Sequence, residues 1–315
     1  MSKILSNTFF VLVASYAVTV SGSILLRTLF DEDVTLVAFI NAVLHVTILP
    51  ALVLLPLSLI LRRWGVSLLL LPPVIFFGVM YAPRLLPKNI QPPADAAPQL
   101  HVMTFNLLAL DRDYGEVMEI LRESGADIIS LQEVTDKAAE AIQQNLTDLY
   151  PYSVFYPGGI PGIGLLSKYP IKEDSVWRTV LQQLRVVIDW DGCDLVLYNV
   201  HPMTPMASTG FSGRNEEIAN LLERIATETD PVLLMGDFNT TDIADPYSAI
   251  TAEFEDAYRV AGEGIGITHH LRGIPILRID YVFYRAPFRA YAASVNQNGG
   301  GSDHRPLSVS LVWDG

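Results

Sequence analysis

The sequence is almost free of cysteine: Cys193 is the single thiol among 315 residues. One cysteine excludes a disulfide within the chain. Cys193 lies in the stretch DGCDLVLYNV, at a position typical of the start of a strand. We interpret it as a small buried residue rather than a reactive thiol.

Charged residues are also scarce, at 17% of the chain, and acids outnumber bases. From residue 100 to the end, 15 Lys and Arg stand against 30 Asp and Glu, which leaves a net charge of −15. So large an acidic excess repels polyanions at long range. The composition therefore argues against a dedicated DNA- or RNA-binding protein, although a local basic patch remains compatible with it.

Apolar residues, by contrast, make up half of the chain, and the mean hydropathy is +0.32. Most of this excess lies in three runs, at residues 7–30, 34–61 and 66–82. A helix that crosses a bilayer needs about 20 mostly apolar residues. A cleaved signal peptide is the alternative for the first run, but its length and the two runs after it favour three transmembrane helices. We expect residues 1–86 to form a membrane region.

The charges that flank these runs predict an orientation. Lys3 precedes the first run, the acidic segment 31–33 follows it, and Arg62 and Arg63 separate the second run from the third. Basic loops favour the cytoplasmic side, so the N-terminus is expected inside. Everything after the third run is then expected outside the cytoplasm.

A proline-rich linker and a globular domain follow the membrane region. Residues 87–99, PKNIQPPADAAPQ, contain four prolines and cannot hold a helix. Between residues 100 and 315, apolar strands alternate with amphipathic helices, and hairpin signals such as the DG turn at 191–192 are frequent. This mixture favours a mixed sheet or a two-sheet sandwich with helices outside.

Acids, amides and imidazoles follow the expected strands at the points where the strands end. Taken one at a time, such residues are ordinary turn or cap residues. Together they indicate a site on one rim of a sheet. They are Asn106, Glu133, His201, Asp237, Asn239, Asp303 and His304, and Asp280 lies inside the strand-like stretch RIDYVFY.

The same residues belong to six short motifs: TFN, LQE, NVH, GDFN, RIDYVF and SDHRP, in that order between residues 104 and 306. This set resembles the endonuclease/exonuclease/phosphatase superfamily over nearly all of residues 100–315. The resemblance implies a four-layer α/β/β/α sandwich and metal-assisted cleavage of a phosphoester. The expected fold is therefore an α/β sandwich preceded by N-terminal transmembrane helices.

The resemblance also implies a metal site. Glu133 matches the principal metal ligand, Asn106 lies beside it, and Asp303 matches a second carboxylate on the metal side. The metal is expected to be Mg²⁺, or alternatively Mn²⁺, because oxygen ligands suit both.

The remaining matched residues are assigned catalytic roles by the resemblance. His304 faces a phosphate oxygen, and Asp280 orients the ring of His304 by a hydrogen bond. Asp237 aligns or deprotonates the attacking water, and Asn239 holds the phosphate or that water. His201 corresponds to a charged histidine on the phosphate side.

Some positions leave alternatives open. Many nucleases of the family carry an acid two residues after the first Asn, where this chain has Leu108, so a second metal site is in doubt. Arg214 either reaches a phosphate or pairs with an acid such as Glu217 as a structural clamp. His269 and His270 either line the substrate cleft or belong to an exposed loop, which is the plainer interpretation.

Three functions are compatible with this reading of the sequence. The first is a membrane-anchored phosphoesterase that acts on a lipid-linked phosphoester or pyrophosphate at the outer face. Its layout is similar to that of a teicoplanin-resistance branch of bacterial proteins, which is associated with undecaprenyl-pyrophosphate dephosphorylation. The second is an extracytoplasmic nuclease, disfavoured by the charge and by Leu108. The third is a catalytically silent binding domain, disfavoured by the complete motif set.

Overall fold

A computed structural model describes residues 3–86, 88, 90, 97–205 and 208–314. The chain divides into two compact units, one of residues 1–86 with 243–245 and one of residues 87–242 with 246–315. Much of the expected linker, residues 87, 89 and 91–96, lies outside the described residues.

The N-terminal unit is helical, as its apolar composition predicts. Its elements are α1 (Lys3–Leu29), α2 (Thr35–Thr47), α3 (Leu49–Ile60), α4 (Trp64–Met80) and the 3-10 helix η1 (Ala82–Leu85). Arg27, the one charge of the first apolar run, donates from Nε to Asn41 Oδ1 at 2.8 Å. Asn41 in turn donates to Glu32 Oε1 at 2.8 Å, so these three polar side chains satisfy one another.

The expectation of three full-length spans is wrong for the described helices. One helix, at Asn7–Leu29, is long and apolar enough to cross a membrane by itself. The second run is broken into α2 and α3, which meet at a bend of 54°. Pro50 explains the break, because its ring lacks an N–H and clashes with the carbonyl four residues earlier. The third run forms α4, whose 17 residues fall short of a standard span.

The C-terminal unit contains two six-stranded sheets and a separate two-stranded hairpin, β10–β11. The first sheet has the order β13-β14-β1-β2-β4-β3 and the second the order β5-β6-β7-β8-β12-β9. The strands of the first sheet are β1 (Gln99–Asn106), β2 (Ile128–Gln132), β3 (Tyr152–Tyr156), β4 (Ile163–Ser167), β13 (Phe288–Val295) and β14 (Leu307–Trp313). Those of the second sheet are β5 (Ile171–Arg178), β6 (Gln182–Trp190), β7 (Cys193–Val200), β8 (Val232–Asp237), β9 (Glu255–Asp256) and β12 (Asp280–Tyr284). The hairpin is formed by β10 (His269–Leu271) and β11 (Ile274–Leu277).

Alternation along the strands creates three apolar layers of packing. In β1, Leu100 and Val102 face the second sheet, whereas Met103 and Phe105 face the outer helices. The helices α5 (Gly115–Glu123) and α6 (Asp136–Leu146) cover the first sheet. The second sheet is covered by α7 (Ser208–Ile225) and α8 (Asp245–Thr251), while α9 (Ala257–Ala261) packs near the sheet edge.

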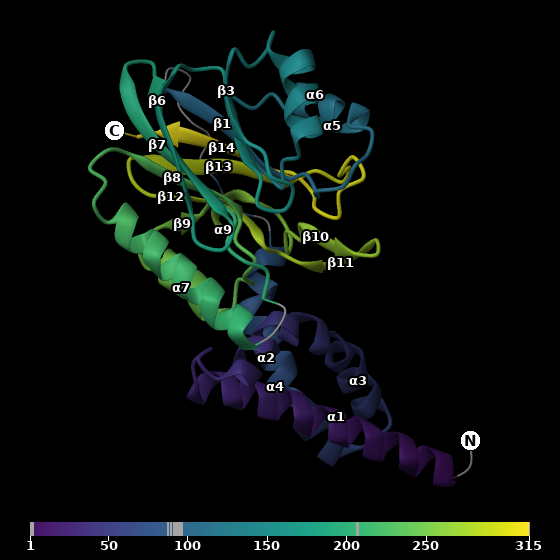
Figure 1. Cartoon of the computed structure of the whole chain (residues 1–315). Helices are drawn as coiled ribbons and strands as arrows, with labels where there is room; N and C mark the ends of the chain where they lie inside the picture. The colour runs from purple at the N-terminus through teal and green to yellow at the C-terminus, as the bar shows by residue number, and fades with distance from the viewer. Residues whose placement is uncertain (1–2, 87, 89, 91–96, 206–207, 315) are drawn as a thin grey trace. The chain divides into compact units, whose positions relative to one another are not determined.

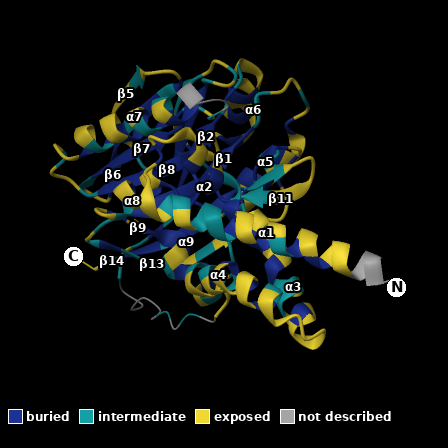
Figure 2. Ribbon diagram, turned by 90° about the horizontal axis from the view of Figure 1, so that it is seen from below, coloured by how far each residue is buried: buried dark blue, intermediate teal, exposed yellow. Residues whose placement is uncertain are grey.

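The expected four-layer α/β/β/α sandwich is thus confirmed. In Figure 1, α5 and α6 lie on one side of the paired sheets and α7 on the other. Figure 2 shows the central strands of both sheets, such as β1, β2, β7 and β8, as buried and the outward faces of the helices as exposed.

The space between the sheets becomes polar toward one end. Gln132 donates from Nε2 to Asn199 Oδ1 at 2.8 Å, and both side chains are fully buried. Asn199 donates to the carbonyl oxygens of Leu131 and Gly164 at 2.9 and 2.8 Å. These bonds link the sheets where the apolar core stops, which is the end that carries the polar strand termini.

Candidate active site

The polar strand ends converge because of how the strands pair. The strands β1 and β2 are parallel, and Asn106 is in register with Gln132, so Asn106 and Glu133 emerge at the same edge. In the second sheet, β7 and β8 are also parallel and end at Val200 and Asp237, just before His201 and Phe238. The strand β12 runs antiparallel to β8 and starts opposite its end, with Asp280 in register with Asp237.

Three residues at this edge have left-handed backbone conformations that only glycine adopts freely. Leu108 has a φ of 58°, Glu133 of 56° and Asn239 of 49°. Such conformations cost about 1–3 kcal/mol each and persist where the surroundings enforce them. Leu108 N donates to Asn106 Oδ1 at 3.0 Å and Ala109 N to Glu133 Oε2 at 2.8 Å. The loop after β1 therefore wraps around the Glu133 carboxylate and fixes it.

The carboxylate of Asp237 is the meeting point of the site. Its Oδ2 accepts a hydrogen bond from Asn106 Nδ2 at 3.1 Å and lies 3.7 Å from both His201 Nε2 and His304 Nε2. Its Oδ1 accepts a hydrogen bond from Asn239 N at 2.9 Å. Asn106 Nδ2 also donates to Glu133 Oε1 at 3.2 Å, so the two sheets are joined through this amide.

Burial is the main cause of the shifted pKa values of Asp237 and His201. It raises the pKa of Asp237 to about 7, with the neighbouring His304 opposing the rise and Asp280 adding to it. It lowers the pKa of His201 to about 4, and the charge of His304 adds to this effect. His201 is therefore neutral at pH 7 in this structure, which differs from the charged histidine that the sequence suggested.

His304 behaves in the opposite way. Burial alone would lower its pKa, but the carboxylates of Asp280 and Asp237 outweigh burial and raise the pKa to about 10. The expected hydrogen bond is present: His304 Nδ1 and Asp280 Oδ2 are 2.9 Å apart, and the Asp280 side chain is completely buried. A charge inside the RIDYVFY strand is tolerated because it is paired with an imidazolium. That pairing leaves Nε2 of His304 directed at Asp237.

Arg214 supports the site without reaching into it through its described contacts. The side chain is buried, and Nη1 donates to the carbonyl oxygen of Asn239 at 3.0 Å. The suggested partner Glu217 instead accepts from Val180 N and Met203 N at 2.8 and 2.7 Å. Of the two expected roles, the clamp describes these contacts better, although its target is a backbone carbonyl rather than an acid.

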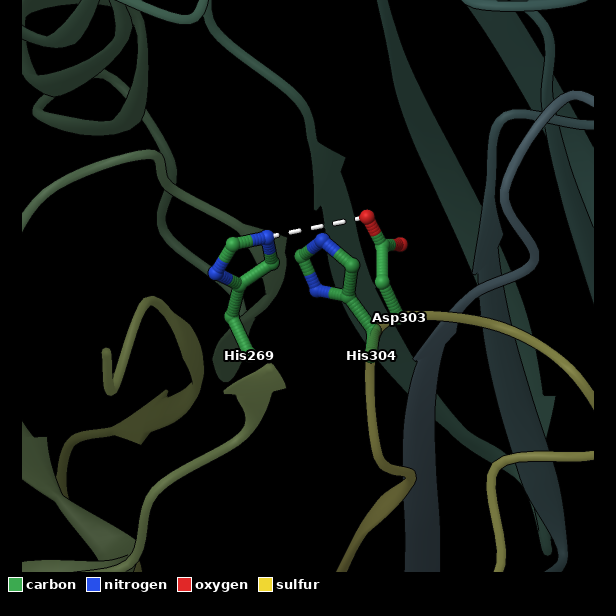
Figure 3. A group of neighbouring side chains, drawn as sticks. All are labelled: His269, Asp303 and His304. Atoms are coloured by element: carbon green, nitrogen blue, oxygen red, sulfur yellow. Dashed lines mark ion pairs between the residues drawn. The ribbon is translucent and has the colours of Figure 1, made fainter. Parts of the chain in front are cut away.

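His269 also lies at the site, contrary to the plainer reading of its loop. It pairs with His304 in an isolated antiparallel bridge, and the two rings are 4.9 Å apart. Its Nε2 lies 3.7 Å from Asp303 Oδ2, as the dashed line in Figure 3 marks. Figure 3 shows the three side chains side by side. The only sequence signal was the position of the THH segment just ahead of the RIDYVF strand.

The predicted metal ligands form two groups. Asn106 and Glu133 are hydrogen-bonded to each other, whereas Asp303 contacts His269. Within the described part of the chain, Asp303 Oδ1 and Asp280 Oδ1 are buried and accept no hydrogen bond. Closely spaced donor sets occur at His269, Asp303 and His304 and at Asp237, Asp280 and His304. The first set offers one carboxylate and two imidazoles, and the second offers two carboxylates and one imidazole; neither contains Glu133 or Asn106. Their carboxylates supply the oxygen donors that a divalent cation such as Mg²⁺ prefers.

Comparisons with known proteins agree with this arrangement. The Endonuclease/Exonuclease/phosphatase family model matches residues 103–304. Among solved structures, the endonuclease/exonuclease/phosphatase from Beutenbergia cavernae DSM 12333 is similar at 22% identity and a TM-score of 0.59, covering 69% of this chain and 72% of that one. A family protein from Bacteroides thetaiotaomicron is 18% identical with a TM-score of 0.57, over 69% of this chain and 99% of that one.

A truncated Caenorhabditis elegans TDP2 is 20% identical with a TM-score of 0.57, over 68% of this chain and 97% of that one. None of the curated proteins compared with the chain matches it. At these identities the solved structures establish the fold alone.

Fold and site define a class of α/β/β/α proteins with acids, amides and imidazoles at one sheet edge. The chain belongs to the endonuclease/exonuclease/phosphatase family, whose enzymes are generally divalent-metal-dependent phosphoesterases and nucleases.

Proposed function

We propose that this protein is a membrane-anchored, divalent-metal-dependent phosphoesterase that hydrolyses a phosphoester or pyrophosphate of a lipid-linked substrate. The main support for a hydrolytic function is that Asn106, His201 and His304 all converge on the Asp237 carboxylate. A binding protein has no need for a buried carboxylate with a pKa near 7 between two histidines.

The side chains divide the chemistry among them. Asp237 acts as the general base toward the attacking water, because a pKa near the working pH is the best compromise for proton transfer. His304 holds a phosphate oxygen from Nε2 as a cation, and Asp280 keeps its ring in place. His201 donates a hydrogen bond as a neutral imidazole, and Asn239 holds the phosphate or the water.

Glu133 and Asn106 would hold a Mg²⁺ or Mn²⁺ ion, with Asp303 as the further carboxylate. The bound ion would supply neutralisation of the charge that develops on the phosphoryl group. Leu108 occupies the place where many family nucleases carry an acid, and its side chain has no oxygen to offer as a ligand. This favours a phosphoesterase with one principal metal over a two-metal nuclease.

The membrane part of the proposal is supported by the helix at Asn7–Leu29 and by charge. Lys3 precedes the helix and the acids of residues 31–33 follow it, so the N-terminus is expected in the cytoplasm and the catalytic unit outside. A helical anchor raises the local concentration of a lipid substrate and does nothing for free polyanions. The charge of −15 beyond residue 100 also slows the approach of nucleic acid.

A substrate panel tests the proposal. The full chain, purified in detergent with Mg²⁺ or Mn²⁺, is assayed on lipid pyrophosphates, sphingomyelin, inositol phosphates and plasmid DNA. We expect turnover on a lipid phosphoester or pyrophosphate, at a higher rate than on DNA. This turnover is expected to disappear when EDTA is added and in Glu133→Ala. Efficient cutting of DNA without any lipid product would make the protein a nuclease, and no turnover on any substrate would make it a binding domain.

A further inference from the structure

Large apolar side chains that remain exposed in the C-terminal unit gather at the end that carries the site. Within the described residues of this unit there are six of them: Leu110, Tyr152, Ile160, Val180, Leu271 and Ile274. Tyr152 is in register with Ser167, which is in register with Ile128, so it lies at the far end of the first sheet. The other five surround the site, and we call them the apolar rim.

Two rim residues stand on loops that hold the metal-side residues. Leu110 is 53% exposed and lies one residue after Ala109, whose N–H donates to Glu133. Ile160 is 58% exposed in the turn after β3, where Gly158 N donates to the carbonyl oxygen of Val134 at 3.0 Å. Both residues therefore belong to loops whose backbone is hydrogen-bonded at or next to Glu133.

The hairpin β10–β11 carries two exposed apolar residues, one on each side of its turn. Leu271 is 56% exposed and Ile274 is 64% exposed, and the hairpin projects from the unit in Figure 1. Its base is fixed to the site, because His269 pairs with His304 and Thr268 Oγ1 accepts from Asp280 N at 3.2 Å.

Val180 completes the apolar rim on the side of His201. It is 47% exposed in the connection between β5 and β6. Three residues later, the Gln183 side chain donates from Nε2 to His201 O and accepts from His201 N at Oε1, both at 2.8 Å. Each rim residue is thus tied through a few covalent or hydrogen bonds to a residue of the site.

Single exposed apolar residues are ordinary, but five around one site mark a contact surface. Under the proposed function, any occupant of this surface has to deliver a phosphoester to the site. A nucleic acid is repelled by the charge of −15, and its backbone offers nothing to aliphatic side chains. The chain also carries an apolar helix able to cross a bilayer.

We propose that the apolar rim contacts the acyl-chain boundary of a phospholipid bilayer, so that a phosphate borne by a lipid reaches the site. This inference rests on the proposed function and names the surface through which it works. The contact is apolar, so it is insensitive to salt and does not require anionic lipid.

Lipid quenching of a probe on the hairpin tests the contact without any substrate. In a Cys193→Ser background, a single cysteine at Leu271→Cys or Ile274→Cys carries an environment-sensitive fluorophore. The full chain is reconstituted into phosphatidylcholine vesicles with spin-labelled acyl chains. Probes at both positions are expected to be quenched, at low and at high salt alike. A probe at Tyr152→Cys, also exposed but at the far end, is the matched control and should stay bright.

Equal quenching at Tyr152→Cys and Leu271→Cys, or none at either hairpin position, overturns the proposal. A second measurement uses activity. The double variant Leu271→Asp with Ile274→Asp is expected to lower the ratio of turnover on a vesicle-borne phosphoester to turnover on a soluble phosphodiester about tenfold. Tyr152→Asp should keep the ratio, and an unchanged ratio in the double variant contradicts the proposal. If the unaltered chain hydrolyses no lipid at all, the proposed function fails, while quenching still decides whether the rim meets the bilayer.

Discussion

At the scale of single residues, the site is organised by buried charges that satisfy one another. Asp280 would be costly inside a strand, yet the His304 imidazolium compensates it at 2.9 Å. The same imidazolium faces Asp237, whose burial raises its pKa to about 7. One carboxylate therefore fixes the cation, and the other remains able to accept a proton.

Replacing Asp280 separates the orienting role from direct catalysis. In Asp280→Asn, the pKa of His304 is expected to fall from about 10, because the nearest carboxylate charge is lost. Metal-dependent turnover is expected to fall about 10- to 100-fold, less than in His304→Ala. Ring-nitrogen NMR measures the pKa, and initial rates measure turnover. A loss in Asp280→Asn equal to or larger than that in His304→Ala would mean that Asp280 touches metal or substrate.

His269 provides a second test at this scale, since its Nε2 lies 3.7 Å from Asp303 Oδ2. Without the ring, Asp303 loses the contact that holds it, and the contact with His269 also keeps its pKa low against the effect of burial. His269→Ala is expected to raise the Mg²⁺ concentration for half-maximal turnover about tenfold. The neighbouring His270→Ala is the matched control. An unchanged metal dependence in His269→Ala would mean that Asp303 does not contribute to metal binding.

At the scale of elements, the sequence predicts what local patterns specify. The strands β1, β2 and β8 were predictable because apolar runs end in polar residues. Parallel pairing of β1 with β2, and of β7 with β8, brings the ends together within each sheet. The hairpin β10–β11 was missed, since HHLRGIPIL is short and depends on the distant bridge from His269 to His304. Likewise α7 begins at Ser208, earlier than the amphipathic pattern from residue 213, through a segment that contains Gly210.

Protonation was also beyond sequence patterns. The NVH motif marks His201, but its charge depends on the depth of burial, which lowers the pKa to about 4. In the same motif, Asn199 serves as a buried link between the sheets rather than as a site residue. The NVH motif therefore identified both residues but did not distinguish the structural role of Asn199 from the site role of His201.

Another element-scale prediction concerns Asp256, which begins α9 and anchors the segment before β12. Its Oδ1 accepts hydrogen bonds from Tyr258 N at 3.0 Å and Arg278 Nη2 at 2.5 Å. Burial alone would raise the pKa of Asp256, but Arg278 outweighs it and lowers the pKa below the ordinary value of 3.8. The pair therefore stabilises the fold above the unfolded pKa, and this contribution is lost as pH falls through the folded pKa.

Asp256→Asn is accordingly expected to lower the free energy of unfolding by about 3–5 kcal/mol at pH 7, because Arg278 stays buried without its main partner. The difference from the unaltered chain should shrink as pH falls below about 4. Denaturation midpoints across pH measure this. Asp148→Asn, which removes an exposed pair with Arg122, is the control and should change little. A pH-independent difference would mean that the amide, not the lost charge, causes the destabilisation.

At the scale of the whole molecule, an apolar N-terminal unit is joined to an acidic catalytic unit. Three apolar runs were visible in the sequence, but their prolines decide how many become full-length spans, and Pro50 breaks the second. The odd number of spans assumed from the sequence is therefore not what supports the orientation. The proposed orientation depends instead on Lys3, which precedes the helix at Asn7–Leu29.

The residues that flank this helix predict on which side of the membrane the C-terminal unit lies. With Lys3 before the helix and no basic residue in the segment 31–33 after it, the N-terminus is expected to stay in the cytoplasm and the chain after the helix to be translocated. A reporter active only in the cytoplasm, fused after Gly315, should be silent, and one active only outside should be active. Replacing Lys3 by Glu together with Asp31→Lys and Asp33→Lys reverses the charge bias and should weaken or invert this pattern. A cytoplasmic reporter that is active in the unaltered chain would instead place the catalytic unit among cytosolic substrates, and the lipid at the outer face would no longer be within its reach.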